Sequence, residues 1–280
     1  AVAAVFSPNE FLSISEEQRN SMGLRALDLS KIKPCVVAGS SRKPILEVRN
    51  LALFYKKKLI LDNLNLSAAP GEIIGIIGHN GAGKSTFSRT LCGLHTNCTG
   101  QILWNGKELN AKSRLKRSYM VMQDVSYQLF ADTLEKECVF GIRHPDLDAA
   151  KQAMERLGIY DYRTHHPNTL SGGQKQRAAC ARAMVAGQSL LLADEPTGAL
   201  DSKASKNLLE IMTRMNRDMG ATILMVTHDA YSASYAARVL FLKDGRLFHE
   251  LLRGERGRPV FYHEVLDVLA LLGGDVSDVI

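Results

Sequence analysis

Hydrophobic and polar positions along the chain divide it near residue 44. Residues 1–43 are polar and rich in serine, and they predict a leader with a short helix ending near residue 22 and a Gly- and Ser-rich linker at 39–44. Beyond the linker, short apolar runs alternate with amphipathic stretches. This alternation predicts an α/β fold with a mostly parallel sheet that helices cover on both faces.

Individual elements follow from the same pattern. Apolar runs predict strands at 45–55, 59–66, 72–78, 190–193 and 221–227. The segment 132–170 is expected to be mainly helical, with 148–157 as its clearest amphipathic stretch, and further helices are expected at 171–185, 207–219 and 264–272. Hairpins are expected at 239–251 and at 102–109, where Asn105-Gly106 suits a type I′ turn.

The strands near 45–66 and 102–109 predict a small antiparallel sheet beside the parallel one. Three regions are therefore expected along the chain. They are a partly helical leader and linker at 1–43, a main domain at 44–252 with a helical subdomain at about 124–170, and a tail at 253–280 with a short helix.

Composition narrows the class of protein. The chain has 280 residues, of which 45% are hydrophobic and 23% charged, and this excludes a disordered, collagen-like or small disulfide-stapled protein. No apolar run approaches the roughly 18 residues that span a bilayer, and no signal peptide is expected. The first residue is Ala rather than Met, which suggests a piece of a longer chain.

Charge and cysteine content are less specific. The net charge of +6 suits a polyphosphate ligand, an acidic membrane surface or nucleic acid equally well. The basic residues form short separate clusters, at 56–58 and 112–117, rather than one block. The five cysteines show no CxxC pair and no histidine at metal spacing, which favours free thiols in a reducing compartment such as the cytosol.

The sharpest chemical signal is a G-x-x-x-x-G-K-[ST] run that follows a predicted strand and opens a predicted helix. In this context the glycines let backbone N–H groups surround phosphate oxygens, and the helix N-terminus adds positive potential. Lys84 is expected to neutralise β/γ-phosphate charge, and Ser85 to place its hydroxyl on Mg²⁺. The run consists of Gly78, His79, Asn80, Gly81, Ala82, Gly83, Lys84, Ser85 and Thr86.

Two adjacent acids, Asp194 and Glu195, end the apolar strand predicted at 190–193. A strand end places them at the carboxyl edge of a parallel sheet, where ligands bind. Beside a phosphate loop, Asp194 is expected to hold the Mg²⁺ shell, and Glu195 to orient or deprotonate an attacking water. By itself this pattern is weak, because a simple strand followed by a turn has the same residues.

A further Gly-containing helix start lies at Ser171, Gly172, Gly173 and Gln174. The simplest interpretation is a helix N-cap followed by flexible glycines. The Gly-Gly step also leaves backbone N–H groups bare at a helix start, which is an anion site. The chain would then have two phosphate-facing helix starts but one lysine loop.

Together these motifs resemble those of an ABC-transporter ATP-binding cassette, over about residues 44–252. The matching elements, in chain order, are the Lys84 loop, Gln123 after a strand, LSGGQ at 170–174, DEP at 194–196, ALD at 199–201 and THD at 227–229. The resemblance implies a P-loop NTPase (RecA-like) core. In that family two cassettes enclose two ATP molecules, and the helix after LSGGQ faces the nucleotide of the opposite subunit.

The resemblance also implies roles for four further residues. Tyr55 would stack on adenine, although a core or strand-end aromatic is the alternative for this position. Gln123 would lie near Mg²⁺ and the attacking water, and Asp201 would couple the two sites. His228 would contact the γ-phosphate.

Different parts of the chain resemble different transporter types. Residues 123–130 resemble the cassettes of energy-coupling-factor importers of vitamins and metal ions, and the leader at 7–19 resembles the joint before the second cassette of fused versions. The carboxyl third, at 196–205 and 245–250, looks more like the ATPases of peptide or lipoprotein exporters. Because the helical segment touches the membrane subunit in this family, the resemblance implies import first and export as the alternative.

The ligands and partners that the resemblance implies are ATP, Mg²⁺, a second cassette that is identical or homologous, and integral membrane permease subunits. The expected position is peripheral, on the cytoplasmic face of the membrane, and no nucleic-acid partner is expected. A soluble ABC ATPase acting on ribosomes or DNA is the rival class. An inactive cassette is a third hypothesis, against which the presence of Lys84, Glu195 and His228 argues.

Overall fold

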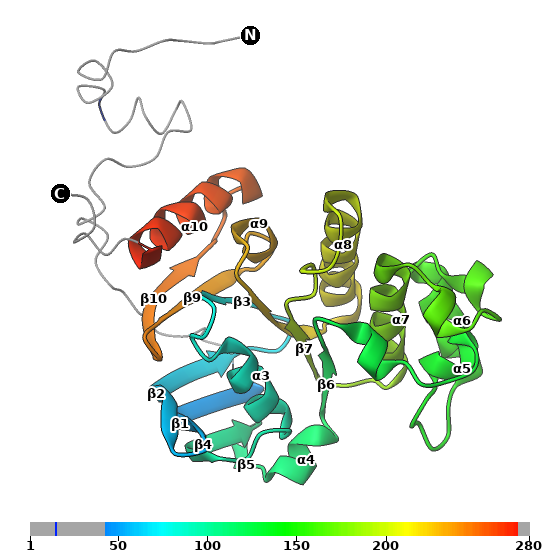
Figure 1. Cartoon of the computed structure of the whole chain (residues 1–280), viewed down its shortest axis with the longest axis horizontal. Helices are drawn as coiled ribbons and strands as arrows, with labels where there is room; N and C mark the ends of the chain where they lie inside the picture. The colour runs from blue at the N-terminus through cyan, green and yellow to red at the C-terminus, as the bar shows by residue number, and fades with distance from the viewer. Residues whose placement is uncertain (1–14, 16–42, 274–280) are drawn as a thin grey trace.

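The chain forms two β-sheets (Figure 1). The structure is a computed structural model, which describes Ser15 and residues 43–273. An antiparallel sheet has the strand order β2-β1-β4-β5, and a larger sheet has the order β10-β9-β3-β8-β7-β6. Within the larger sheet the pairs from β9 to β6 are parallel, and only β10 pairs antiparallel, with β9. The predicted α/β fold with a mostly parallel sheet and an antiparallel side sheet is therefore confirmed.

Most strands keep close to the predicted bounds, but the first strand of the hairpin predicted at 102–109 begins earlier, at Cys98. The strands are β1 (Leu46–Tyr55), β2 (Lys58–Ala68), β3 (Ile73–Gly78), β4 (Cys98–Trp104), β5 (Lys107–Glu108), β6 (Ser118–Val121), β7 (Leu190–Asp194), β8 (Thr222–Thr227), β9 (Arg238–Lys243) and β10 (Arg246–Leu252). The longer helices are α3 (Lys84–Cys92), α6 (Leu147–Arg156), α7 (Gly172–Val185), α8 (Ser202–Met219) and α10 (Arg258–Gly273). Shorter ones are α4 (Ala111–Leu115), α5 (Leu134–Cys138) and α9 (Ala230–Ala233).

Both predicted hairpins form on two-residue turns. Asn105 and Gly106 have φ angles of 49° and 77°, the left-handed pair that a type I′ turn requires. Asp244 and Gly245 repeat this geometry with φ angles of 48° and 75° between β9 and β10. The second turn is therefore two residues long, and the strands on either side extend further than the predicted runs.

The prediction of a mainly helical segment at 132–170 is wrong in its extent. Between α5 and α7 the described chain has one helix of more than one turn, α6, with short 3₁₀ turns and loops around it. Pro145 and Pro167 cannot continue a helix, and Gly141 and Gly158 adopt positive φ angles of 81° and 62°. Figure 1 shows α5 and α6 grouped with α7 at one end of the molecule, so the helical subdomain also includes α7.

Two helices are longer than predicted. α8 begins at Ser202 rather than at 207, because the carboxylate of Asp201 accepts the Ala204 N–H at 2.7 Å and caps the helix. α10 covers 16 residues rather than 264–272, and Pro259 lies near its start, where proline is tolerated. Its apolar face contributes Phe261, Val265, Val268 and Leu272 to the core. The helix predicted before residue 22 lies outside the described residues.

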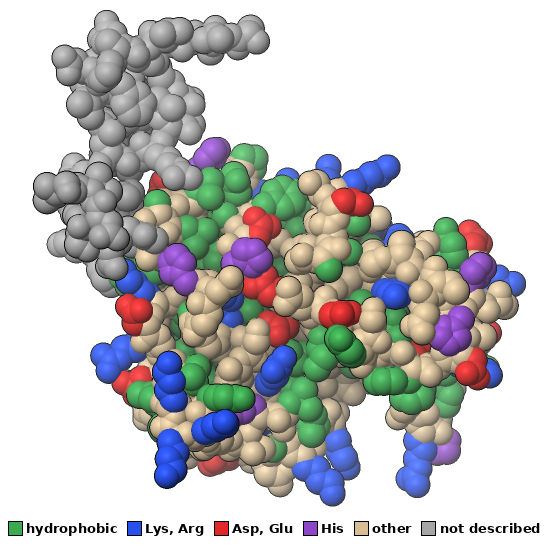
Figure 2. Space-filling model, in the orientation of Figure 1, with side chains coloured by type: hydrophobic (Ala, Val, Ile, Leu, Met, Phe, Trp, Pro, Cys, Tyr) green, Lys and Arg blue, Asp and Glu red, His purple; other side chains and the backbone are tan. Residues whose placement is uncertain are grey.

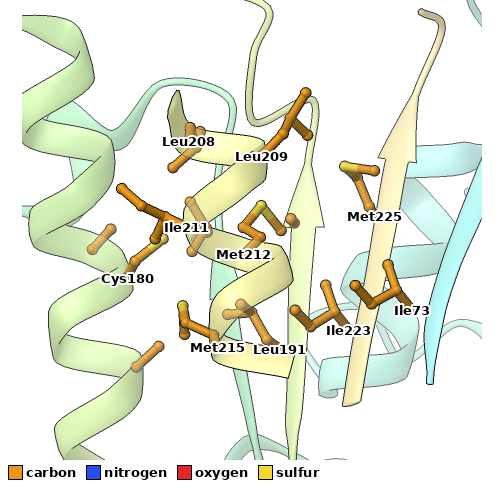
Figure 3. Packing of buried hydrophobic residues seen from close by; sticks show 14 of the residues in the cluster. Ile73, Cys180, Leu191, Leu208, Leu209, Ile211, Met212, Met215, Ile223 and Met225 are labelled. Carbon is orange, nitrogen blue, oxygen red and sulfur yellow. The ribbon is translucent and has the colours of Figure 1, made fainter. Parts of the chain in front are cut away.

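The core is divided by the parallel sheet. Leu191 and Ile223 face a cluster that includes residues of α7, α8 and α10, whereas Leu190 and Leu192 face a second cluster with α3 and the antiparallel sheet. Figure 3 shows the first cluster, where Met212 and Met215 of α8 and their neighbours lie between the sheet and α7. Successive side chains of β7 point to opposite faces of the sheet, and both faces are buried. The continuous apolar run of this strand predicts this burial.

Surface charge and the cysteines agree with the sequence analysis. Figure 2 shows Lys and Arg side chains spread along the lower edge of the molecule, over the antiparallel sheet and α4, rather than in one block. Cys92, Cys138 and Cys180 are buried free thiols and Cys98 is a half-buried one, and burial raises the pKa of Cys138 and of Cys180 to about 12. Within the described part of the chain, no helix combines the length and hydrophobicity that crossing a membrane requires.

The turn after α3 gives a test of the packing between α3 and α4. Gly93 has a φ of 90°, and a Cβ at this position would lie 2.2 Å from the backbone oxygen of Ala111. Gly93→Ala should therefore lower the free energy of unfolding by roughly 2–4 kcal/mol, from left-handed strain and overpacking together. Gly187→Ala is the matched control, because Gly187 has a φ of 61° and nothing lies within 4 Å of the point that its Cβ would occupy.

Chemical denaturation of the two variants measures the difference. The control should lose about 1–2 kcal/mol, the cost of the left-handed conformation alone. Equal losses in the two variants would mean that the contact between Gly93 and Ala111 does not constrain the fold.

Candidate nucleotide site

The loop between β3 and α3 is shaped by its glycines. A Cβ at Gly78 would lie 2.6 Å from the backbone oxygen of Leu242, and one at Gly83 would lie 2.7 Å from the Cγ2 atom of Ile60. Gly81, with a φ of 85°, has nothing within 4 Å of its Cβ position. Packing therefore requires glycine at Gly78 and Gly83, whereas Gly81 leaves open space in which a ligand can approach the backbone.

Lys84 lies at the centre of this loop. Its side chain is buried, and its Nζ donates to the backbone oxygens of Gly78 at 2.7 Å and His79 at 3.0 Å. Burial lowers the pKa of Lys84, while the negative charges of Glu195 and Asp194 act in the opposite direction. The ammonium is held inside the loop, among backbone groups that a phosphate would contact.

Ser85 joins the loop to the end of β7. Its hydroxyl donates to Oδ1 of Asp194 at 2.9 Å, and burial raises the pKa of the Asp194 carboxyl. A hydroxyl and a carboxylate oxygen side by side are ligands that suit Mg²⁺. Residues 43–273 contain no group of three or more His, Cys, Asp or Glu side chains that could hold a metal alone. A Mg²⁺ ion here would therefore need phosphate or water oxygens as further ligands.

Glu195 and His228 follow neighbouring parallel strands. Glu195 is buried and has a positive φ of 50°, and its Oε2 lies 2.8 Å from Nδ1 of His228. Because β7 and β8 end at the same edge of the sheet, residues that are 33 positions apart meet there. The imidazole is exposed on its other side, so this pair can both orient a carboxylate and face a ligand.

Gln123 lies between β6 and the loop that follows Glu195. Its Nε2 lies 3.3 Å from the Cβ position of Gly198, whose N–H donates to the Glu195 backbone oxygen at 3.0 Å. Its own backbone oxygen accepts from Nε2 of Gln176, on α7, at 3.3 Å. The structure therefore brings Gln123 close to the Glu195 backbone and to α7.

The predicted helix start at 171–174 does not meet the phosphate loop. Ser171 caps α7, and the Gln174 side chain accepts the Ser171 N–H at 2.7 Å, so the two residues form a capping box. A cavity of about 310 Å³ lies beside it, and Asp201 is in its wall. Its lining residues come from α7, α8 and the segment before α8, and none comes from the loop at 78–86.

Tyr55 and the tip of the loop are exposed. Tyr55 ends β1 with 62% of its surface accessible, so it is a strand-end aromatic, as one alternative predicted, and is not part of the core. His79, Asn80 and Gly81 are exposed as well, while Ala82 and Thr86 are half-buried. No described contact joins the Tyr55 ring to the loop.

A capping network beside His228 was not identified from the sequence. Asp229 accepts the N–H groups of Tyr231 and Ser232 at 3.0 and 2.9 Å, and it caps α9. The Ser232 hydroxyl lies 3.0 Å from that of Thr197, two residues after Glu195. Asp is a favoured N-cap residue, so Asp229 before the segment at 230–233 could have indicated this helix start.

Comparisons with known proteins agree with this geometry. A family profile described as "ABC transporter" matches residues 61–198, which include the phosphate loop and Asp194–Glu195. The ABC transporter ATP-binding protein YxdL of Bacillus subtilis is 38% identical, over 84% of this chain and 96% of its own length. The bacitracin export ATP-binding protein BceA of Halalkalibacterium halodurans is 36% identical, over 84% of this chain and 99% of its own length. An ABC transporter ATP-binding protein of Treponema denticola is 37% identical over 86% of this chain, and the chain spans 50% of that protein.

Two solved structures have the same fold. CbiO1 of Clostridium perfringens, part of the ABC transporter complex cbiONQ, is 28% identical with a TM-score of 0.71, over 81% of this chain and 93% of CbiO1. The ATP-binding cassette MJ0796, in a dimeric post-hydrolysis state bound to ADP and Pi, is 29% identical with a TM-score of 0.65, over 74% of this chain and 98% of MJ0796.

Fold, motif order and relatives therefore agree. The P-loop NTPase core, the side sheet and the helical subdomain occur together, and relatives above 30% identity extend over most of the chain. The chain belongs to the ATP-binding cassette family of ABC transporters, which hydrolyses ATP.

Proposed function

We propose that this chain is the ATP-hydrolysing subunit that powers an integral membrane permease from the cytoplasmic face of the membrane, as one of two paired cassettes. The observation that carries the proposal is the meeting of Lys84, Ser85, Asp194, Glu195 and His228 at one edge of the sheet. A phosphate loop, two carboxylates and a histidine in this arrangement suit hydrolysis of a nucleoside triphosphate.

Within this proposal each residue of the site has a separate role. The N–H groups of the loop and Lys84 bind the phosphates, and the exposed Tyr55 ring stacks on adenine. Ser85 and Asp194 hold Mg²⁺, which neutralises phosphate charge when bound. Glu195 accepts a proton from the attacking water, and His228 orients its carboxylate through the 2.8 Å contact. Gln123, which follows β6, would lie near this water and Mg²⁺.

The second cassette explains the cavity beside Ser171. This helix start and Asp201 lie apart from the chain's own phosphate loop, so a phosphate bound at the N-terminus of α7 would belong to another molecule. The dimeric state of the cassette MJ0796 supports such a pairing. We therefore propose that each site is completed by a second copy or a homologous cassette.

The permease would contact an exposed aromatic surface of the helical subdomain. Tyr127, Phe130 and Phe140 are 76%, 66% and 50% exposed, and the rings of Phe130 and Phe140 lie 5.9 Å apart. We call these three residues the aromatic face. Large exposed apolar side chains that gather in one place mark an interaction surface.

The transported material is proposed from the same part of the chain. Residues 123–130, which resemble the importers of vitamins and metal ions, carry two residues of the aromatic face. CbiO1, a structural neighbour, is described as part of the ABC transporter complex cbiONQ. We therefore propose energy-coupling-factor import of a vitamin or metal ion.

Export is the second candidate, and a specific observation favours it. BceA, which is named for bacitracin export, is similar over 99% of its own length, including the carboxyl third. That third also resembles the ATPases of peptide exporters. The two candidates differ in the permease that the aromatic face would contact.

Co-purification distinguishes the candidates. When the chain is co-expressed with the transmembrane subunit of an energy-coupling-factor importer, we expect capture of the complex from detergent extracts. Phe130→Ser combined with Phe140→Ser should reduce capture roughly tenfold or more, the effect of losing ~1.4 kcal/mol or more at an interface hot spot. Val260→Ser is the control, because Val260 is 54% exposed but lies on α10.

Other outcomes would replace the proposal. Capture by the large-loop permease of a peptide exporter, and not by the importer subunit, would assign export. Turnover that ribosomes stimulate without any membrane partner would support the soluble class instead.

The role of Glu195 can be tested by one substitution. Glu195→Gln should retain ATP binding, because the amide has the same shape, but it cannot accept the proton of the attacking water. We expect phosphate release to fall roughly 10²–10⁴-fold, the size of a general-base contribution. Calorimetry of ATP binding is the control measurement. Hydrolysis at the parent rate would assign the base elsewhere.

The charge of Asp194 should lower the stability of the nucleotide-free protein. Burial raises the pKa of this carboxyl above its ordinary value of 3.8, so its ionisation opposes folding. The protonated carboxyl contributes to the free energy of unfolding in full below pH 3.8, the pKa of the unfolded chain. This contribution is lost as the pH rises through the raised pKa of the folded protein. Asp194→Asn should therefore raise the melting temperature at neutral pH without nucleotide, and the gain should vanish as the pH falls below 3.8.

Thermal melting over this pH range provides the test. Asp201→Asn is the control, since asparagine caps a helix as well as aspartate does, and it should leave the melting temperature nearly unchanged. A gain in Asp194→Asn that is independent of pH would contradict the electrostatic explanation.

A further inference from the structure

A buried carboxylate in α5 holds the backbone of the aromatic face. Glu137 has no exposed surface, and its Oε2 accepts the N–H groups of Phe130 at 2.7 Å and Ala131 at 2.8 Å. The backbone oxygen of Glu137 accepts the Phe140 N–H at 3.1 Å. One residue therefore fixes the backbone at both Phe130 and Phe140.

The other oxygen of Glu137 forms an ion pair with Arg182 of α7. Arg182 is buried as well, and its Nη1 also donates to the backbone oxygen of Gln128 at 2.9 Å. Its Nε donates to the hydroxyl of Tyr119 at 2.5 Å, and the guanidinium lies 5.2 Å from the centre of that ring. We call Glu137, Arg182, Tyr119 and Gln128 the ion-pair cluster.

The Gln128 side chain extends the cluster to the parallel sheet. Its Oε1 accepts the Met122 N–H at 2.8 Å, and its Nε2 donates to the Met120 backbone oxygen at 2.6 Å. Tyr119 and Met120 belong to β6. The ion-pair cluster thus joins the strand before Gln123, helices α5 and α7, and the segment that carries Phe130.

Stability alone does not explain a buried ion pair. Desolvation of two charges offsets much of their attraction, and apolar residues of similar volume are often as stabilising. What the charged pair provides is directional: five charge-assisted hydrogen bonds specify where α7 lies relative to the 128–131 backbone. An apolar pair would allow α7 to shift against that backbone.

The position of Arg182 along α7 is the second observation. Ser171, at the start of α7, borders the cavity proposed to receive the partner's phosphate, and Arg182 follows eleven residues later. At a rise of 1.5 Å per residue, Arg182 lies about 16 Å along the helix axis from Ser171. A movement of the helix start would therefore also move Arg182. Ser171 and the aromatic face are therefore connected by one rigid helix and one ion pair.

We infer that Glu137 and Arg182 are positioning residues that couple the nucleotide-facing end of α7 to the aromatic face. The inference rests on the proposed pairing of two cassettes around ATP. When a nucleotide of the partner draws the start of α7 toward it, Arg182 moves with the helix, and Glu137 carries the movement to Phe130 and Phe140. Neither residue contacts the nucleotide.

The test replaces the pair without leaving a buried charge. Glu137→Gln combined with Arg182→Met removes both charges at similar volume and keeps an acceptor for the N–H groups of Phe130 and Ala131, so the fold is expected to persist. A trifluoromethyl-phenylalanine at position 140, in a Glu195→Gln background, reports the environment of the aromatic face by ¹⁹F NMR. We expect MgATP to shift this resonance in the parent and to leave it unmoved in the double variant.

Lys151→Ala combined with Glu155→Ala is the matched control. This pair is an exposed ion pair on α6 of the same subdomain, and its removal should retain the shift. Thermal melting and basal ATP hydrolysis, measured with Glu195 intact, should be retained in both double variants. If the pair has a coupling role, the Glu137 and Arg182 double variant loses only the ¹⁹F response to MgATP. If the pair has a merely structural role, the double variant also loses stability or activity.

Two results would overturn the inference. One is a double variant that is folded and still shows the parent shift, and the other is a parent whose resonance MgATP does not move. Light scattering on the Glu195→Gln protein measures MgATP-dependent pairing separately, so a failure of the proposed dimer is distinguished from a failure of the coupling. If the double variant does not fold, Arg182→Lys, which keeps a positive charge beside Glu137 but loses the directed guanidinium contacts with Gln128 and Tyr119, takes its place with the same expected loss of response.

Discussion

The hydrogen bond between Ser85 and Asp194 is the contact on which the arrangement of the site depends. The two residues are 109 positions apart, at the start of α3 and the end of β7, and β8 separates β3 from β7 in the sheet. The bond holds the phosphate loop over the edge where β7 and β8 end. Glu195 and His228 lie at that edge, so the loop, the carboxylates and the histidine meet there only while the loop stays in place.

The charges of this site favour binding of a charged ligand. Burial lowers the pKa of Lys84 and raises that of Asp194, so both charged forms are disfavoured in the empty protein. A phosphate provides negative charge for Lys84, and a divalent cation provides positive charge for Asp194. The same burial that destabilises the empty site therefore favours a nucleotide and Mg²⁺ together, a common relation between stability and activity.

The two ends of α7 have different roles in the proposed function, one near the partner's nucleotide and the other near the permease. Its start, capped by Ser171, borders a cavity that the chain's own loop does not line, whereas Arg182 near its other end contacts the backbone beneath the aromatic face. A helix is stiff along its axis, so the ends cannot move independently. In the proposed function, nucleotide binding and permease contact would be linked by ordinary packing and a few charged hydrogen bonds, without a long chain of separate contacts.

The sequence by itself determined the family and most of the strands, and it predicted the residues of the site, because all of these depend on local patterns. The loop at 78–86 requires adjacent residues, the type I′ turn requires Asn105-Gly106, and a buried parallel strand is a continuous apolar run. The helical segment was overestimated because Gly141 and Gly158, with positive φ angles, follow the ends of α5 and α6, where an amphipathic pattern alone would continue a helix. Tertiary structure decided what depends on distant residues: the contact of Glu195 with His228, the exposure of Tyr55, and the burial of Glu137 against Arg182. Charged side chains such as these two look like solvated surface in a sequence, since only packing from four separate elements shows that water has been removed from them.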